Sequence, residues 1–254
     1  MLPDQPDPLL REIFPSRPKC TPLRASKEDV YVNLDKEDIH CHDTRPRVVR
    51  VSHEWKGLQM HGEGTGIADN RTQQVRTALT GLMSTIANKP ECARAVFRAS
   101  SRLEEGVRCS VRVRDFDPLV VDEPAELGGG DAGMNPVELV LAALGACQEI
   151  MYAAYASVLG MDLGGVEVEC KGELDLRGLF GLGESVPPGF TKIRYETKIA
   201  SLEDEEKIRT LVHLVESRCP VLDILARPVA VSGTTALNGR TLAVREAAKH
   251  PAAA

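Results

Sequence analysis

A long apolar segment constrains the fold of this chain more than any other part of its sequence. Residues 135–159 read NPVELVLAALGACQEIMYAAYASVL, and after Val137 three residues are strongly polar: Glu138, Gln148 and Glu149. Asn135 is a favourable N-cap, Pro136 suits the first helical position, and Glu138 completes a capping box. We therefore predict a helix that begins here. Because it is apolar on nearly every side, it is either a buried core helix or a membrane span, and its charges favour the core helix.

Cys147 lies near the middle of this predicted helix. Helical spacing places six apolar residues on the same face as the thiol: Val140, Ala143, Leu144, Ile150, Met151 and Ala154. Small residues around Cys147 would allow another backbone to approach closely. Considered alone, a cysteine in this position is most simply a small core residue.

The composition is that of an ordinary globular protein. The chain has 254 residues, of which 43% are hydrophobic and 27% are charged, and its net charge is −6. An acidic chain with 4% aromatic residues does not suggest binding to nucleic acid or to an anionic membrane. Seven cysteines without CxxC pairs indicate individual thiols in a reducing compartment, and the acidic, proline-rich start does not resemble a signal peptide. We therefore expect a cytoplasmic protein.

We interpret residues 1–66 as an N-terminal extension that is partly extended or irregular, because its first 27 residues contain six prolines and no periodicity. Histidines and one cysteine gather in its second half: His40, Cys41, His42, His53 and His61. Their spacing matches no standard zinc pattern, so we expect no metal site. A weaker reading is that this cluster binds a metal for recognition of a partner.

Residues 67–240 are predicted to form one α+β domain, followed by a flexible tail over residues 241–254. Apolar periodicity predicts helices over residues 70–88, 203–218 and 221–226. Alternation predicts strands over residues 93–103, 107–114, 119–122, 166–176, 191–199 and 229–234. A glycine-rich stretch, residues 126–133, precedes the apolar helix and lacks the pattern of a phosphate-binding loop, so we expect a flexible loop at the mouth of a site.

Cys219 lies at the break between the last two predicted helices, in ESRCPVLDIL. Because Pro220 suits a first helical position, Cys219 would be the N-cap of the short helix, where the helix dipole favours a thiolate. A structural cysteine at a bend is an equally good reading of this residue alone.

These motifs together resemble one protein family. The run VVDEPAELGGGDAGMNPVELVLAALGAC, followed about seventy residues later by SRCPVLDIL, is similar to the OsmC/Ohr family of osmotically inducible and organic hydroperoxide resistance proteins. The resemblance extends from about Ala93 to Thr234 and includes the strand FRASSRL. It implies antiparallel sheets packed around a long buried helix, in an intertwined homodimer with both active sites at the subunit interface.

The resemblance also implies a chemistry without metal, haem or other cofactor. Cys147 corresponds to the cysteine that attacks an organic hydroperoxide, and Cys219 to the one that resolves the sulfenic acid as a disulfide. A cellular dithiol, often on a lipoylated protein, would then reduce that disulfide. Arg102 corresponds to the cation that stabilises the thiolate, although a solvated strand arginine is the simpler reading without the family context.

The sequence departs from the family at one position. Peroxidase members have a glutamate directly after the Asn-Pro pair, where it orients the arginine, whereas this chain has Val137. Glu126, Glu138 and Glu149 are possible substitutes. We therefore expect an antioxidant thiol peroxidase, and the alternative is an OsmC-like protein that binds an apolar small molecule without turnover. The presence of both Cys147 and Cys219 within the family motifs favours the enzyme, because a protein that only binds a ligand has no need of both.

Overall fold

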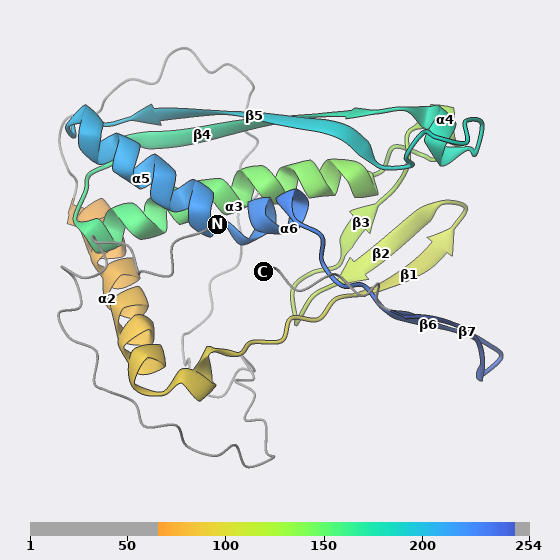
Figure 1. Cartoon of the computed structure of the whole chain (residues 1–254), viewed down its shortest axis with the longest axis horizontal. Coiled ribbons are helices and arrows are strands. Elements are labelled where there is room, and N and C mark those ends of the chain that lie inside the picture. The colour runs from red at the N-terminus through yellow and green to blue at the C-terminus, as the bar shows by residue number, and fades with distance from the viewer. Residues whose placement is uncertain (1–65, 247–254) are drawn as a thin grey trace.

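The computed structural model describes residues 66–246 and has a mixed α and β architecture (Figure 1). Six elements precede the apolar helix, and the first four are α2 (Gly66–Asn88), a 3-10 turn η1 (Pro90–Ala93), and the strands β1 (Ser100–Glu105) and β2 (Arg108–Arg112). After β3 (Leu119–Val121) and η2 (Ala125–Leu127) comes α3 (Pro136–Leu159). The second half contains β4 (Gly165–Leu174), α4 (Leu176–Leu179), β5 (Phe190–Ala200), α5 (Glu205–Arg218), α6 (Pro220–Ala226), β6 (Gly233–Leu237) and β7 (Arg240–Arg245).

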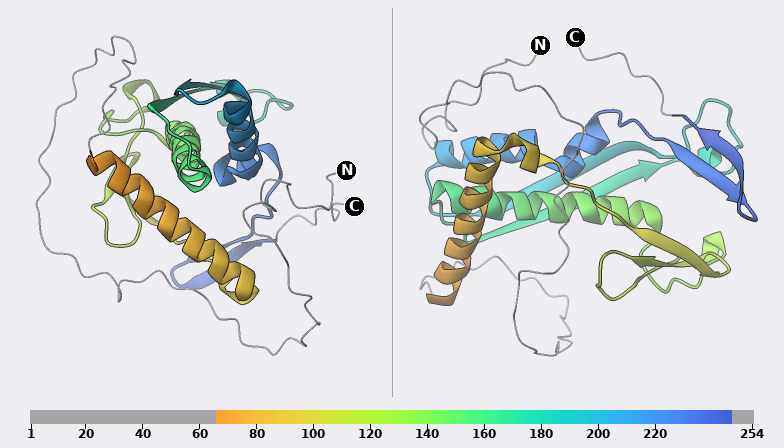
Figure 2. Two further views of the ribbon diagram at one scale, coloured as in Figure 1. Left: turned by 90° about the vertical axis from the view of Figure 1, so that its left-hand side faces the viewer. Right: turned by 90° about the horizontal axis from the view of Figure 1, so that it is seen from below.

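All strand pairs in the described part are antiparallel, in agreement with the α+β prediction. The strands form a β1–β2–β3 sheet, a long β4–β5 ribbon and a β6–β7 hairpin. Figures 1 and 2 show α3 lying along the β4–β5 ribbon, with α5 and α6 beside it and α2 crossing near its C-terminal end. The β4–β5 ribbon alternates between half-buried and exposed residues, as expected when one face is covered by helices and the other meets water.

The start of α3 follows the sequence prediction. The Asn135 side chain accepts a hydrogen bond from the Glu138 N–H, and the Glu138 carboxylate accepts one from the Asn135 N–H, both at 2.9 Å. The helix ends at Gly160, whose left-handed backbone (φ 70°) favours glycine. By length and composition α3 could cross a membrane, but α2, α5, α6 and β4 all pack on it here.

The buried face of α3 is narrower than predicted. It follows Leu144, Gln148, Tyr152 and Ala156, which are at most 3% exposed. Ile150, expected beside Cys147 on an apolar face, is 67% exposed. Within one copy of the chain no described element covers the remaining surface of α3, so burial of that surface in a homodimer stays a prediction.

A core cluster joins the C-terminal half of α3 to α5. Its buried members are Tyr152, Ala156, Met161, Leu211 and Val215, with Val166 of β4 and Ile199 of β5 packed against them. Since Leu211 and Val215 are fully buried, they hold α5 against α3 up to the turn that precedes Cys219.

The glycine-rich loop is fastened to the end of β3, contrary to the flexible loop that we predicted. The Asp122 carboxylate, 3% exposed, accepts hydrogen bonds from the N–H groups of Glu123, Gly130 and Ala132. A Cβ atom on Gly129 would lie 1.8 Å from the Glu123 carbonyl oxygen. The loop therefore requires glycine because the backbone passes so close to β3.

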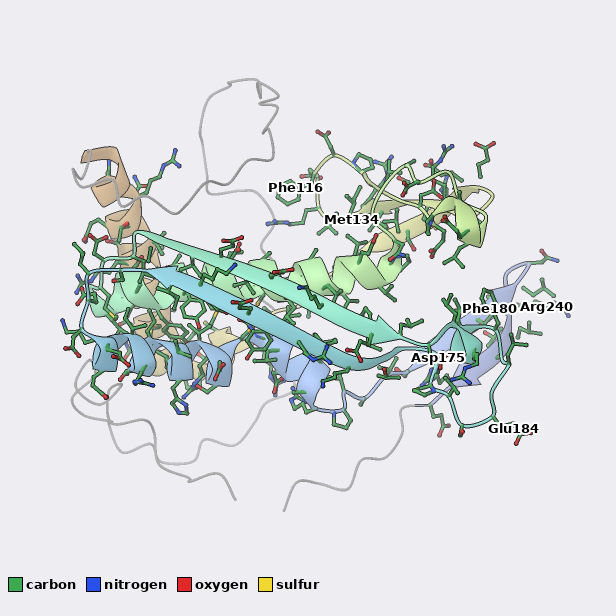
Figure 3. The ribbon with its side chains drawn as sticks, turned by 90° about the horizontal axis from the view of Figure 1, so that it is seen from above. Phe116, Met134, Asp175, Phe180, Glu184 and Arg240 are labelled. Carbon is green, nitrogen blue, oxygen red and sulfur yellow. The ribbon has the colours of Figure 1, made fainter. Side chains whose placement is uncertain are left out.

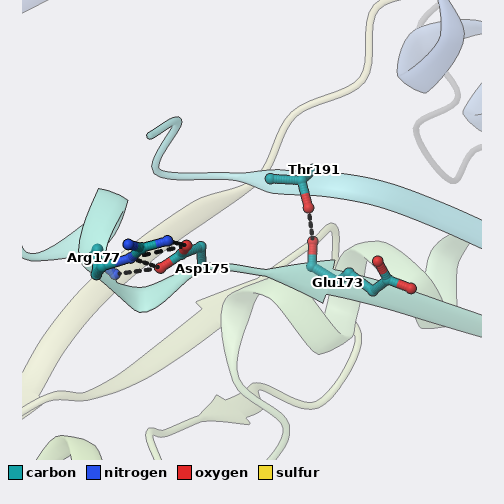
Figure 4. A network of polar contacts seen from close by, with 4 residues as sticks. All are labelled: Glu173, Asp175, Arg177 and Thr191. Atoms are coloured by element: carbon teal, nitrogen blue, oxygen red, sulfur yellow. Dashed lines mark hydrogen bonds and ion pairs between the residues drawn. The ribbon is translucent and has the colours of Figure 1, made fainter. Parts of the chain in front are cut away.

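Polar contacts close the far end of the β4–β5 ribbon (Figure 4). Thr191 Oγ1 donates to the Glu173 carbonyl oxygen at 3.0 Å, and Asp175, the N-cap of α4, is paired with Arg177. Figure 3 shows Asp175 with Phe180 and Glu184 at this end of the ribbon. The pKa of Asp175 is lowered to about 2, and the largest cause is its side-chain hydrogen bond with Arg177.

Two boundaries near the C-terminus differ from the sequence prediction. The strand expected over residues 229–234 begins later, as β6, and residues 240–245 form β7 where the flexible tail was expected to begin. Asn238 and Gly239 form the intervening turn with positive φ angles, which suit a tight hairpin. The predicted extension over residues 1–66, with its histidine cluster, lies almost wholly outside the described residues.

Candidate functional site

The structure brings Cys147 and Cys219 together. Their sulfur atoms are 3.4 Å apart, and both are free thiols. Cys147 is held in the middle of α3, whereas Cys219 is at once the last cap of α5 and the N-cap of α6. The short helix predicted after Cys219 is therefore present, and Pro220 occupies its first turn.

The two thiols differ in their surroundings. Cys219 is 1% exposed, while Cys147 is only partly buried and so remains accessible from one side. Burial raises the pKa of Cys147, a hydrogen bond from the Val221 N–H lowers it, and the neighbouring Cys219 raises it, with a net upward shift. The N-terminus of α6 thus acts on Cys147, although burial outweighs it within one chain.

Arg102 does not join this pair within one chain. It lies on β1 in a polar hollow of about 330 Å³, lined by Ser100, Ser101, Glu104, Ser110 and Arg112. In the register of the β1–β2 pair, Arg102 lies opposite Ser110. Among residues 66–246, no hydrogen bond or ion pair links Arg102 to either thiol.

Two of the three possible substitutes for the missing glutamate are already engaged. Glu138 belongs to the capping box, and Glu149 Oε1 accepts a hydrogen bond from the Val168 N–H at 3.2 Å. Glu126 lies in η2. Val137, in the first turn of α3, is 36% exposed, so a larger polar side chain could be accommodated there.

An apolar cavity of about 320 Å³ lies one helical turn from each thiol. Its walls come from α3, β5 and α6, and its lining residues are Leu144, Phe190, Thr191, Lys192, Ile193, Tyr195, Leu222, Leu225 and Ala226. Leu144 is three residues before Cys147, and Leu222 is three after Cys219. Sequence reasoning did not identify this cavity, because its walls are formed by segments distant in the sequence.

Polar residues behind the thiols were also missed. Gln148 is fully buried next to Cys147, and its Oε1 accepts from Thr197 Oγ1 at 3.4 Å. On the same face of β5, the Tyr195 hydroxyl donates to Glu216 Oε1 at 3.0 Å. A glutamine in an apolar helix and a tyrosine at an inward strand position were the available signals.

No cluster of three or more metal-ligating side chains occurs in the described part of the chain. The remaining described cysteines are Cys92, Cys109 and Cys170, each partly buried. Cys109 and Cys170 lie in strands β2 and β4, as predicted. Burial, followed by the charge of Glu149, raises the pKa of Cys170, which favours an inert thiol there.

Comparison with known proteins identifies the region that contains both cysteines. Residues 128–233 match the family described as OsmC-like protein. No curated protein matches the chain.

Several solved structures are similar to the chain. One is an OsmC-like protein from Mycoplasma pneumoniae, with 18% identity and a TM-score of 0.45 over 52% of this chain and 89% of that one. Others are organic hydroperoxide resistance proteins: one from Legionella pneumophila (23% identity, TM-score 0.41, 52% and 91% covered) and one from Elizabethkingia anophelis (20%, 0.41, 52% and 89%). The match over residues 128–233 confirms, for this part of the chain, the resemblance to OsmC-like proteins that the sequence motifs indicated.

Proposed function

We propose that this protein is a thiol peroxidase that reduces organic hydroperoxides. The Cys147 thiolate attacks the terminal peroxide oxygen, the O–O bond breaks, and the products are an alcohol and a Cys147 sulfenic acid. The Cys219 thiol then attacks the oxidised sulfur, a disulfide forms and water leaves. A dithiol reductant, of the kind carried by a lipoylated protein, restores the two thiols by exchange and becomes a disulfide itself.

The single observation that carries this proposal is the 3.4 Å separation of the two sulfur atoms. A disulfide requires about 2.05 Å, so a shift of little more than 1 Å would bring them into bonding distance. A buried thiol this close to an accessible one can capture a sulfenic acid before further oxidation. A purely structural pair would have no need for the exposed side of Cys147.

Because the pKa of Cys147 is raised, a single chain lacks a group that would stabilise the Cys147 thiolate. A thiol with a raised pKa is largely protonated near neutral pH, and the thiolate is the nucleophile. A cation is therefore needed, and Arg102 of the same chain is not in contact with Cys147. We propose a homodimer in which both active sites lie at the subunit interface and Arg102 of a second copy serves each site.

Exposed apolar residues support this assembly. Ile150 of α3 is 67% exposed, Phe116 63% and Met134 44%. Figure 3 shows Phe116 and Met134 on the side of α3 that carries the β1–β2–β3 sheet. Apolar residues exposed in this way on one copy commonly mark a protein–protein interface.

The apolar cavity beside the thiols favours a second candidate function. A protein of this fold could hold an apolar small molecule between α3, β5 and α6 without turnover. Under that reading Cys147 and Cys219 would be passive, so oxidation of the thiols separates the two functions.

The decisive experiment is intact-mass measurement after one equivalent of cumene hydroperoxide. The wild-type protein should lose about 2 Da as Cys147 and Cys219 form a disulfide, whereas Cys219→Ser should gain about 16 Da as a sulfenic acid. Peptide mapping should show the Cys147–Cys219 link, with the other cysteines reduced. Unchanged masses, or a dominant link through another cysteine, would contradict the peroxidase.

The cation can be tested through the pH dependence of Cys147 alkylation. In a Cys219→Ser background, iodoacetamide should report a midpoint below the ordinary thiol value of 9.0. Arg102→Ala should move that midpoint upward and lower kcat/KM for the hydroperoxide by roughly a hundredfold. Arg108→Ala, which removes a β2 arginine paired with Glu105, is the matched control. An unchanged midpoint in Arg102→Ala would remove Arg102 from the site.

A further inference from the structure

The position of Cys219 depends on the end of a helix, whereas that of Cys147 does not. Cys147 is built into the middle of a 24-residue helix. Cys219 lies at a bend with an extended backbone (φ −69°, ψ 113°), between α5 and the seven-residue α6. In α6, Val221 and Leu222 are half-buried and no residue is fully buried, whereas α5 carries the fully buried Val215 in its last turn, so that turn is the firmer anchor for the second sulfur.

A hydrogen bond ties that last turn of α5 to the sheet. Glu216, three residues before Cys219, accepts from the Tyr195 hydroxyl of β5 at 3.0 Å. Tyr195 is opposite Cys170 in the long β4–β5 register, so its backbone is firmly paired. Burial, followed by the hydrogen bond to Glu216, raises the pKa of Tyr195 to about 12, and its hydroxyl therefore stays protonated as a donor at neutral pH.

The same strand face also holds the other thiol-bearing helix. Tyr195 and Thr197 are two residues apart and point to the same side of β5. Thr197 donates to the side chain of Gln148, the residue after Cys147. One face of β5 thus holds both helices by hydrogen bonds: it contacts α3 next to Cys147 and α5 close to Cys219.

We propose that Tyr195 is a positioning residue for the thiol pair: through Glu216 it sets Cys219 against Cys147 and so favours closure of the disulfide. Tyr195 acts on the thiol pair through its hydrogen bond to Glu216, and it also lines the apolar cavity. When its hydrogen bond is removed, the last turn of α5 samples more positions, and closing the disulfide costs more conformational entropy. This inference rests on the proposed function in that it treats Cys147 and Cys219 as a redox pair.

The test measures disulfide formation without peroxide. In glutathione redox buffers the two thiols lose two electrons to one oxidised glutathione, which yields two reduced glutathione molecules. The equilibrium constant for the Cys147–Cys219 disulfide, quantified by peptide mapping, should fall about fivefold in Tyr195→Phe. Tyr155→Phe, the same change on the partly buried face of α3, is the matched control and should stay within twofold of wild type.

Two further measurements distinguish an effect on the position of Cys219 from a general loss of folding or of Cys147 reactivity. The rate of sulfenic acid formation at Cys147, trapped with dimedone in a Cys219→Ser background, should be the same with Glu216 and with Glu216→Ala, because Glu216 does not line the apolar cavity. Glu216→Ala should lower the equilibrium constant as much as Tyr195→Phe, and the double variant should lower it no further. Glu216 is exposed, so this variant should fold.

An equilibrium constant within twofold of wild type in Tyr195→Phe, or fully additive effects in the double variant, would overturn the proposal. An equal loss in the dimedone rate would also overturn it. Because the glutathione equilibrium does not involve hydroperoxide, failure of the peroxidase function would appear separately, as an absence of sulfenic acid in wild type and variants alike.

Discussion

At the scale of single residues, the chemistry depends on charge around one partly buried thiol. Burial and Cys219 raise the pKa of Cys147, and the Val221 N–H opposes them. A cation held close to Cys147 would lower the pKa of this thiol and so stabilise the reactive thiolate. Substitutions at Val137 and Arg102 test this balance of charge around Cys147.

Val137→Glu should raise kcat/KM for an aryl hydroperoxide. A glutamate in the first turn of α3 could pair with the proposed Arg102 and hold its guanidinium in place, and peroxide cleavage requires a fixed donor at the leaving oxygen. Steady-state kinetics measure the change, with Val137→Gln, which has a similar size and no charge, as control. No gain in Val137→Glu with the fold intact would indicate that another residue already orients the cation, and Glu126 would be the next to replace.

Asp122→Asn should lower stability near neutral pH and lower it less in acid. Although burial raises the pKa of Asp122, three backbone N–H donors lower it, and the net shift is downward from 3.8. A lowered folded-state pKa contributes stability above the unfolded value that is lost as the pH falls through the folded value. Urea midpoints at pH 7 and pH 3 measure the difference between wild type and variant, which should shrink at pH 3. A constant difference would show that Asp122 does not bind the loop as a carboxylate.

At the scale of elements, the loop before α3 and the bend after α5 place the two thiols. The glycine-rich loop carries the chain from β3 to the capped start of α3, and its backbone lies against Glu123 and Val120. The α5–α6 bend places Cys219. Neither segment is regular, so each depends on specific close contacts.

Gly129→Ala should destabilise the protein by more than the usual cost of one methyl group. The added Cβ would overlap the Glu123 carbonyl oxygen at 1.8 Å, so the backbone itself must move. Gly81→Ala in α2 meets no atom within 4 Å and should be neutral or slightly stabilising, since alanine favours a helix by about 0.5–1 kcal/mol over glycine. Thermal unfolding compares the two. Equal melting temperatures would contradict the close packing of the loop on β3.

At the scale of the whole molecule, one copy leaves much of α3 uncovered. Val137 and Val140 are each 36% exposed and Ile150 is 67% exposed, while β4 has a partner strand on one side. An apolar helix with this much exposed surface is expected to be covered by another chain. The proposed dimer would cover it and would bring a cation to each Cys147.

Light scattering should therefore give the mass of two chains at micromolar concentration. Ile150→Glu, which places a charge on the exposed side of α3, should shift the protein toward one chain and lower its peroxidase activity in parallel. Leu202→Glu, which makes a similar change at a residue that is 90% exposed in the turn before α5, is the control for an added negative charge. A monodisperse single-chain species in the wild type would contradict the dimer.

The sequence alone identified the features that depend on local interactions. The capping box at Asn135, the break at Pro220 and the alternation of β4 and β5 are all consequences of residues within a few positions of one another. The family motifs added the expectation that Cys147 and Cys219 form a pair. Segments with weaker local signals were placed less well: the strand expected from residue 93 begins at Ser100, and the one expected from residue 229 begins at Gly233.

The tertiary structure decided which face of α3 is buried and what surrounds the thiols. Periodicity cannot locate the core in a helix that is apolar on all sides, and the buried line proved to include Gln148. The clamp of Asp122 on the glycine loop, and the contact between Tyr195 and Glu216, join residues that are distant in the chain or irregular in backbone. Such contacts depend on how β5, α3 and α5 pack together, because that packing brings the side chains within hydrogen-bonding distance.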